Sequence, residues 1–513
     1  MYASHGFLRS DIGDVDVVWD GSRFHLFHLV LPNHDFIAHA VSEDGLGWTR
    51  VKNALFVGDP GSWDDDMLWT MHVTPDPWRQ RRWRMFYTGL SRREYGRVQR
   101  VGTAVSDDLY EWTKVDSGYP IEATGPHYEH DPMRGRKWVS FRDPFYFHDG
   151  DERLLLVAAR SDQGPLIRRG CVAQLRETEP NVFEPLPPLH RPNLYDDIEV
   201  PNLFRIAGRY FLLGSIREDV KVHYWYADAL GGAFENFFDN VLLPTGNYAA
   251  RVCRTDDQLL LFNFFQKRER DGILKRMLPP PKELAMDGTG RLRLTSYRGF
   301  DDEVTAVMTH RDVGTLDTLF NNGTAGIVHD DADYHISARS GYEAFLLPGE
   351  LDHCRIRCKL SLDGFGKCGL VLRLDDQANG YYLSLDLIKG IAQVRGWGER
   401  EGGIDQSAFN YQQLQAAHFI SDGDGPWEME IVLYGQYIEC AINKYVVLTL
   451  ADDTYRRGRA GFYVESAKLC ISDLRVDQLR PPREEQHGMD GANPFSSYGG
   501  SSVNQAAESN DAI

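Results

Sequence analysis

The amino-acid sequence predicts an all-β protein in which a β-propeller is followed by an antiparallel β-sandwich. Short β-type runs separated by turn residues recur from residue 15 to residue 265, and segments with a helical period are almost absent. Ala-Val-Ser, a short acidic turn and a Trp occur twice, over 40–48 and 104–112. Divergent repeats of roughly 40 to 60 residues fit propeller blades, so about 300 residues would make about five blades.

The sequence pattern changes near residue 300, where the first β-rich region ends. A proline-rich stretch over 278–284 leads towards a second β-rich region. Apolar and polar residues alternate over 427–432, which indicates a strand with one buried and one solvent face. We expect a propeller over 1–305 and a sandwich over 306–480. Residues 481–513 are rich in Gly, Ser, Asn and acids, which predicts a disordered tail.

Composition and charge narrow the classes of partner. The net charge of −19 on 513 residues argues against binding to nucleic acid or anionic membranes and fits a neutral substrate. The seven Cys have no regular spacing, which favours buried thiols over a disulfide framework or a zinc site. No signal-peptide pattern and no apolar run of about 18 residues are found, so a cytoplasmic protein is expected, and secretion with a leader that has been removed is the alternative. A homo-oligomer remains open.

Three carboxylates occupy equivalent places in the first domain. Asp14, Asp143 and Glu199 each come just before the apolar run of a predicted strand. Each by itself could be a turn residue or a solvated loop acid. In a propeller, however, the starts of the innermost strands surround one central funnel. The repeated placement therefore favours a shared site, in which a carboxyl group with a raised pKa can act as a general acid.

Several motifs give the first domain a resemblance to glycoside hydrolase family 32, the invertase, levanase and inulinase group. Phe141-Arg142-Asp143-Pro144 resembles that family's Arg-Asp-Pro motif, and Glu199-Val200-Pro201-Asn202-Leu203-Phe204 resembles its Glu-Cys-Pro-Asp-Leu-Phe motif. Weaker similarities follow the family order over 20–27, 39–48, 86–89, 248–250 and 281–292. The resemblance implies a five-bladed propeller backed by a sandwich. The segment over 458–466 is also similar to the last strands of concanavalin-like sandwiches.

The resemblance implies a retaining glycosidase that cleaves β-fructofuranosides such as sucrose or fructans, without a metal or other cofactor. Asp14 would be the nucleophile, Glu199 the acid/base, and Asp143 the group that stabilises the transition state. The family's Asn-Asp-Pro-Asn-Gly is replaced here by Gly13-Asp14-Val15-Asp16-Val17. Asp16 is the alternative nucleophile, because residues two apart in an extended segment face the same side.

Four further residues are predicted to bind the sugar or to support the catalytic acids. Arg142 would supply a fixed positive charge beside Glu199, and Tyr248, Trp69 and Asp66 would line the funnel.

Other functions stay open at this point. The same site could transfer the fructosyl unit to a second sugar, and the altered first motif also admits an arabinofuranosidase-like or xylosidase-like enzyme. A third alternative is a propeller that binds carbohydrate without turnover. The sandwich is expected to support the propeller, and sugar binding by it is the alternative.

Overall fold

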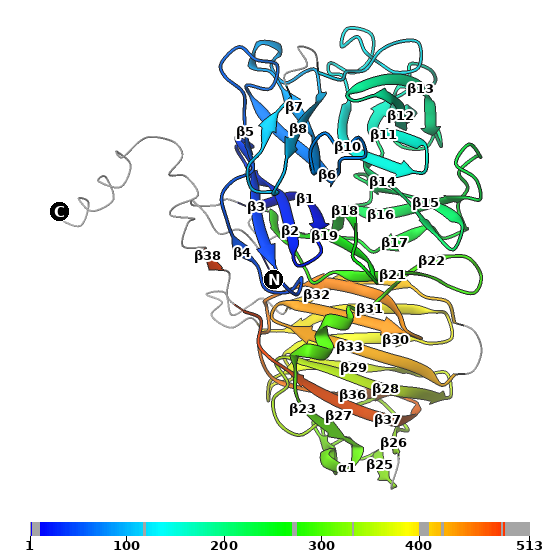
Figure 1. Ribbon diagram of the computed structural model, residues 1–513. Helices are drawn as coiled ribbons and strands as arrows, with labels where there is room; N and C mark the ends of the chain where they lie inside the picture. Colours follow the sequence, from blue (N-terminus) through cyan, green and yellow to red (C-terminus); the bar gives the residue numbers. More distant parts are fainter. Residues whose placement is uncertain are drawn as a thin grey trace, which may run out of the picture.

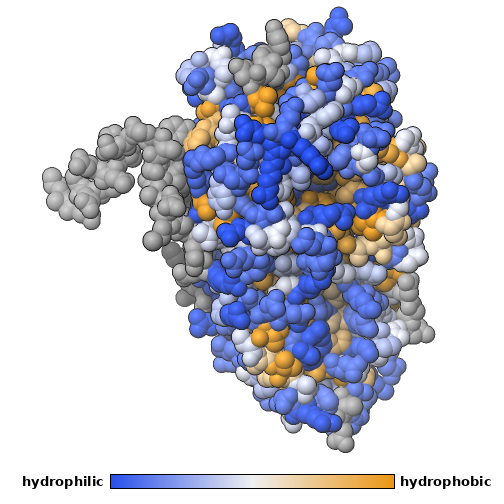
Figure 2. Space-filling model, in the orientation of Figure 1, coloured by the Kyte–Doolittle hydropathy of each residue, from blue (hydrophilic) through white to orange (hydrophobic). Residues whose placement is uncertain are grey.

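The structure is a computed structural model, and it has the predicted all-β architecture. A propeller and a sandwich lie one against the other (Figure 1). It describes residue 2 and residues 11–115, 120–268, 274–330, 333–399, 410–421, 425–483 and 486–487. Hydrophilic side chains cover most of the face shown in Figure 2, and apolar residues form scattered patches on it. No helix in the described ranges is both long and apolar enough to span a bilayer.

The first two blades come from the first 114 residues. Blade 1 consists of β1 (Asp11–Trp19), β2 (Phe24–Leu31), β3 (Phe36–Ser42) and β4 (Thr49–Arg50), with β5 (Leu55–Phe56) beside β3. Blade 2 consists of β6 (Met67–Pro75), β7 (Trp83–Leu90), β8 (Arg100–Ser106) and β9 (Thr113–Lys114). Both are antiparallel meanders, as short hairpin turns between strands predict.

The other three blades repeat this order. Blade 3 is β10 (Phe141–Asp149), β11 (Glu152–Arg160), β12 (Gly170–Glu179) and β13 (Val182–His190). Blade 4 is β14 (Glu199–Ile206), β15 (Arg209–Ile216), β16 (Lys221–Ala227) and β17 (Val241–Leu243). Blade 5 is β18 (Asn247–Arg254), β19 (Leu259–Arg268), β21 (Lys282–Met286) and β22 (Leu292–Thr295), with β20 (Leu274–Met277) on β19.

The propeller is closed by apolar packing between blades. The innermost strands β1, β6, β10, β14 and β18 contact one another in cyclic order. Buried clusters fill each gap, for example Phe27 of blade 1 with Met85 of blade 2, and Phe211 of blade 4 with Leu261 of blade 5. Because every blade contributes to two clusters, the innermost strands are held in a fixed ring.

Two packed sheets form the sandwich. One has the order β25 (Ala325–His329), β26 (Tyr334–Ala338), β37 (Lys468–Leu479), β28 (Cys354–Asp363), β33 (Trp427–Tyr434), β34 (Tyr437–Ile442) and β35 (Tyr445–Ala451), with β23 (Val304–Thr309) on β37. The other has the order β24 (Asp317–Thr318), β27 (Tyr342–Leu346), β36 (Arg459–Glu465), β29 (Lys367–Leu374), β30 (Gly380–Asp386), β31 (Ile391–Gly398) and β32 (Asn410–His418). The described elements also include three short 3-10 turns (Arg92–Glu94, Leu166–Arg168, Arg298–Glu303) and α1 (His310–Val313).

After the sandwich, the chain returns to blade 1. Arg483 forms ion pairs with Asp44 at 2.7 Å and Glu303 at 3.0 Å, and β38 (Gln486–His487) pairs in parallel with β4. Thus the start of the predicted tail over 481–513 contacts the propeller. The rest of that prediction, from residue 488 onwards, lies outside the described residues.

Candidate active site

Each innermost strand carries a one-residue β-bulge near its start. The pairing with the second strand of the blade shifts between Ile12 and Val15 on β1, between Trp69 and Met71 on β6, and at the equivalent places on β10, β14 and β18. A bulge breaks the alternation of side chains and re-aims one of them. The five bulges surround the propeller axis, and the predicted carboxylates are in or beside three of them.

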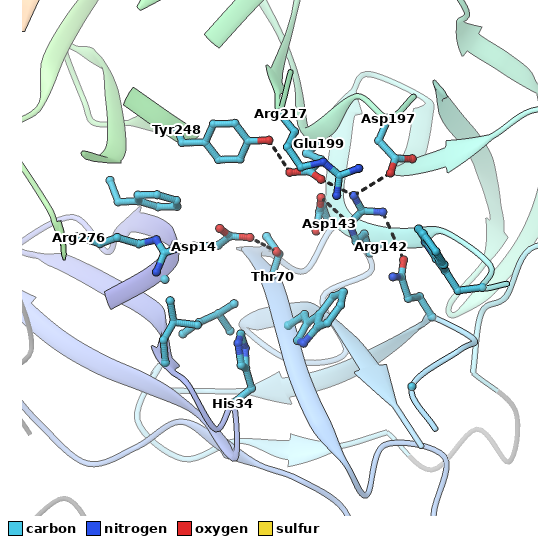
Figure 3. A pocket seen from close by; sticks show the side chains of 18 of the residues that line it. Asp14, His34, Thr70, Arg142, Asp143, Asp197, Glu199, Arg217, Tyr248 and Arg276 are labelled. Atoms are coloured by element: carbon cyan, nitrogen blue, oxygen red, sulfur yellow. Dashed lines mark hydrogen bonds and ion pairs between the residues drawn. The ribbon is translucent and has the colours of Figure 1, made fainter. Parts of the chain in front are cut away.

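The side chains of these bulges meet in one cavity of about 850 Å³. Asp14 reaches it from β1, Asp143 from β10 and Glu199 from β14, so three separate blades supply the three acids (Figure 3). The structure therefore brings together the three carboxylates that the sequence singled out.

Asp14 lies deep in the cavity and remains partly accessible from it. The Thr70 hydroxyl of the β6 bulge donates a hydrogen bond to its carboxylate. Burial, followed by the negative charge of Asp143, raises the pKa of Asp14 to about 7, against the opposing effect of the Thr70 hydrogen bond. Asp14 is therefore a carboxylate whose charge changes near neutral pH.

The backbone holds Asp143 in a left-handed conformation, with φ of 59°. Its amide donates to the Thr88 hydroxyl at 3.1 Å, and its carboxylate accepts the Val200 amide at 3.1 Å. Burial raises the pKa of Asp143, although the charge of Arg142 opposes this, with Nε 3.6 Å from the carboxylate. Asp143 is thus fixed from both neighbouring blades.

Two donors hold Glu199 at its two oxygens. Arg142 Nη2 donates to Oε1 at 2.6 Å, and the Tyr248 hydroxyl donates to Oε2 at 2.6 Å. Arg142 is held in turn by Asp197 at 3.3 Å, and Gln99 accepts from its other nitrogen at 3.4 Å. Burial would raise the pKa of Asp197, but the charges of Arg142 and Arg136 outweigh it and the pKa is lowered. The predicted support of Glu199 by Arg142 agrees with this geometry.

Asp16 does not line the cavity, which corrects the prediction that it shares the funnel with Asp14. Its carboxylate accepts the Val73 amide at 2.6 Å and lies 3.7 Å from Arg251 Nε. Arg251 is fully buried and donates to the carbonyls of Pro201 and Pro144, both at 2.8 Å. The bulge between Ile12 and Val15 places Asp14 in the cavity and turns Asp16 towards Arg251 and β6, where it stabilises the inner strands.

Of the other predicted sugar-binding residues, some line the cavity and one does not. Trp69 and Tyr248 line the cavity. Asp66 is not among the lining residues, and its side chain lies 3.7 Å from exposed Arg92, so the prediction for Asp66 is also corrected.

Several cavity residues were not predicted from the sequence. They are the Asp14 partner Thr70, the Arg142 partners Gln99 and Asp197, the aromatic rim residues Tyr95 and Trp138, and the basic residues Arg97, Lys137, Arg217 and Arg276. Asp197 belongs to the acidic stretch before Glu199. Its position two residues before Glu199 is the feature of the sequence from which its place in the site could have been predicted.

Among the described residues, a possible metal-ligand group lies away from this cavity. Asp333 directly precedes β26 of the sandwich, His335 lies on β26 and Cys470 lies on the neighbouring strand β37, and their ligand atoms are within 4.8 Å of one another. No member of this group lines the cavity.

Residues 16–257 match the profile of the glycosyl hydrolases family 32 N-terminal domain. The propeller belongs to glycoside hydrolase family 32. Asp143 and Glu199 lie inside the matched range, whereas Asp14 lies two residues before it. No curated protein sequence gives a significant match to the chain.

Solved structures of the same family share the fold of the whole molecule. Fructan 1-exohydrolase IIa from Cichorium intybus superposes with a TM-score of 0.67 at 13% identity, covering 95% of this chain and 98% of that one. Exo-inulinase from Aspergillus awamori gives 0.67 at 14% identity, with coverages of 94% and 98%. Sucrose-6-phosphate hydrolase from Lactobacillus gasseri gives 0.65 at 14%, with 92% and 91%. The family 32 propeller is thus followed by the same kind of sandwich.

Proposed function

We propose that this family 32 protein is a retaining glycosidase that hydrolyses β-fructofuranosides. The observation that carries the proposal is the convergence of Asp14, Asp143 and Glu199 from three blades on one cavity. Retaining glycosidases require a carboxylate nucleophile and a carboxylic acid on either side of the bond that is cleaved.

In the first step, a carboxylate oxygen of Asp14 attacks the anomeric carbon of the fructosyl unit, and the bond from that carbon to the leaving oxygen breaks. Glu199 gives its proton to the leaving oxygen. In the second step, a water molecule attacks the same carbon, Glu199 takes the water proton, and the Asp14 carboxylate is released. Asp143 accepts hydrogen bonds from sugar hydroxyls, which strengthen as positive charge develops on the ring.

The hydrogen bonds of the site support these roles. Arg142 and Tyr248 fix both oxygens of Glu199, and Thr70 fixes the Asp14 carboxylate, so each acid keeps its direction before substrate binds. Structures of the same fold contain 1-kestose in fructan 1-exohydrolase IIa from Cichorium intybus and sucrose in a β-fructofuranosidase from Bombyx mori. Their bound sugars support a β-fructofuranoside as the substrate class.

Incubation with sucrose, 1-kestose, inulin, levan and an aryl arabinofuranoside tests the proposal. We expect fructose as the released sugar, and NMR of the first product should show retained anomeric configuration. Asp14→Asn and Glu199→Gln should each lower the rate by about a thousandfold or more. Release of arabinose without fructose, or activity of either variant within about tenfold of wild type, would contradict the proposal. Fructosyl transfer would be recognised by longer oligosaccharides among the products.

A further inference from the structure

One cysteine of the sandwich differs from the others in its surroundings. Of the seven Cys, Cys470 on β37 is partly exposed and the rest are buried. Its direct partner on the neighbouring strand β26 is His335. Tyr334 and Ile336, on either side of His335, are buried in the core, so the imidazole points outwards. Paired residues of an antiparallel ladder share a face, which puts the Cys470 thiol and the His335 imidazole side by side on the outer surface of the sheet.

A carboxylate completes the group. Asp333 comes two residues before His335, and side chains two apart in an extended segment lie on the same face. The Asp333 amide donates to Asp330 Oδ1 at 2.8 Å, and the Asp330 amide donates to the Asp333 carbonyl at 3.1 Å. These two hydrogen bonds hold Asp333 at the start of β26. The ligand atoms of Asp333, His335 and Cys470 are then within 4.8 Å of one another.

The charges around this group favour a cation. Burial raises the pKa of the Cys470 thiol, and the negative charges of Asp333 and Asp330 raise it further. Among the described residues, no Lys or Arg forms an ion pair with Asp333. Asp330 Oδ2 lies 3.5 Å from His335 Nε2. An imidazole that binds a metal usually has a carboxylate beside it, which orients the ring and raises its basicity.

The donor set selects the kind of ion. A thiolate, an imidazole and a carboxylate together are typical ligands of Zn²⁺, whereas Ca²⁺ and Mg²⁺ prefer oxygen atoms alone. Ligand atoms around a tetrahedral zinc ion are about 3.3 to 3.7 Å apart, given zinc bonds of about 2.0 to 2.3 Å. Movements of about 1 Å by the ends of the three side chains would therefore close the group around one ion, without a change in the strands.

We propose that Asp333, His335 and Cys470 bind one Zn²⁺ ion, with water at the fourth position. β26 lies with β25 and α1 at the end of the sandwich farthest from the propeller (Figure 1), and none of the three ligands lines the active-site cavity. The ion joins β26 to β37. Because unfolding separates Cys470 from the other two ligands, zinc binding stabilises the folded protein.

Titration of the full chain tests the proposal. Protein without a histidine tag, kept reduced and freed of metal by a chelator, is titrated with ZnSO₄ in a calorimeter. We expect about one ion per chain, with a Kd of about 1 μM or below. Titration with Co²⁺ reports the ligands, because tetrahedral Co²⁺ absorbs strongly in the visible range and a bound thiolate adds a charge-transfer band in the near ultraviolet. We expect both signals.

Variants then assign the ion to these side chains. Cys470→Ser and His335→Gln should each weaken zinc binding by about a hundredfold or more, and Asp330→Asn by about tenfold. His329→Gln is the matched control, because His329 is exposed on β25 close to the site and is not one of the ligands. This variant should bind zinc with the wild-type Kd. Saturating Zn²⁺ should raise the melting temperature of wild type and His329→Gln, but not that of Cys470→Ser.

Several results would overturn the proposal. Zinc binding weaker than about 100 μM would do so, and so would tight binding that is unchanged in both Cys470→Ser and His335→Gln, since the ion would then be held elsewhere on the chain. A cobalt complex without the charge-transfer band would exclude the thiol as a ligand. Melting of the metal-free variants at the wild-type temperature shows that any loss of binding is not a loss of the fold. None of these measurements depends on the proposed glycosidase activity.

Discussion

At the scale of single residues, Thr70 affects the pKa of Asp14, the candidate nucleophile. Its hydroxyl is the side-chain donor to Asp14, and this hydrogen bond lowers a pKa that burial and Asp143 raise to about 7. We expect Thr70→Val to lower kcat by about tenfold to a hundredfold, since one hydrogen bond to a charged group is lost. The acid limb of kcat/KM should move to higher pH, because Asp14 must be ionised to attack.

Thr70→Ser is the matched control, since it keeps the hydroxyl and should keep the wild-type pH profile. An unchanged acid limb in Thr70→Val, measured with saturating and limiting substrate, would show that Thr70 has only a packing role.

The raised pKa of Asp14 also affects stability. Between pH 3.8 and about 7, the unfolded chain has released the Asp14 proton while the folded protein keeps it. Stability is therefore lost as pH rises through this window, and above it the protein carries the full cost of a buried charge. Asp14→Asn removes that charge, so we expect its propeller to be more stable than wild type by about 2 kcal/mol at pH 8 and by much less at pH 4.5.

Thermal melting at the two pH values checks this. Asp16→Asn is the contrast, because Asp16 accepts the Val73 amide and lies beside Arg251, and its loss should lower the melting temperature at pH 8. A lower melting temperature for Asp14→Asn at pH 8 would contradict the assigned environment.

At the scale of the elements, the bulge of β18 aims Tyr248 at Glu199. Ala249 follows Tyr248, has φ of 50° and is completely buried. A residue with a side chain is strained in this conformation, and a β-branched one most strongly. We expect Ala249→Gly to gain about 1 kcal/mol of stability and Ala249→Val to lose more than about 2 kcal/mol. Melting temperatures of both variants, with fructose release as the activity readout, measure the cost of holding Tyr248 in place.

The elements themselves were largely predictable, because strands and hairpins follow local patterns. The repeated motif is an example: Ser42 with Asp44 and Ser106 with Asp108 cap the same turn, at the ends of β3 and β8. The placement of Asp143 and Glu199 at strand starts could also be predicted from the sequence.

The bulges were not predictable. The alternation of an ideal strand puts Asp14 and Asp16 on one face, and the extra residue in β1 separates them. A bulge leaves no clear signal in a single sequence, and Thr70 was missed for the same reason.

At the scale of the whole molecule, the two domains share a buried polar network. Lys282 of β21 is completely buried, donates to the Pro280 carbonyl at 3.1 Å and lies 5.1 Å from the ring centre of Tyr437 in the sandwich. Glu439 accepts hydrogen bonds from Tyr437 and from Ser296 of the propeller. Burial lowers the pKa of Lys282 to about 8, although the charge of Glu439 opposes the shift.

A double-mutant cycle tests whether this network couples the domains. Lys282→Met alone leaves Glu439 as a buried carboxylate without its compensating cation, and we expect a loss of about 3 kcal/mol at pH 7. Glu439→Gln alone should also destabilise, because Lys282 then lacks its counter-charge. The double variant should recover most of the loss, and calorimetry should show separate melting of propeller and sandwich only in the single variants. Additive losses would mean that Lys282 and Glu439 act independently and that apolar packing alone joins the domains. The surface pair Lys52 and Glu111 is the control, since we expect the losses of Lys52→Ala and Glu111→Ala to be additive.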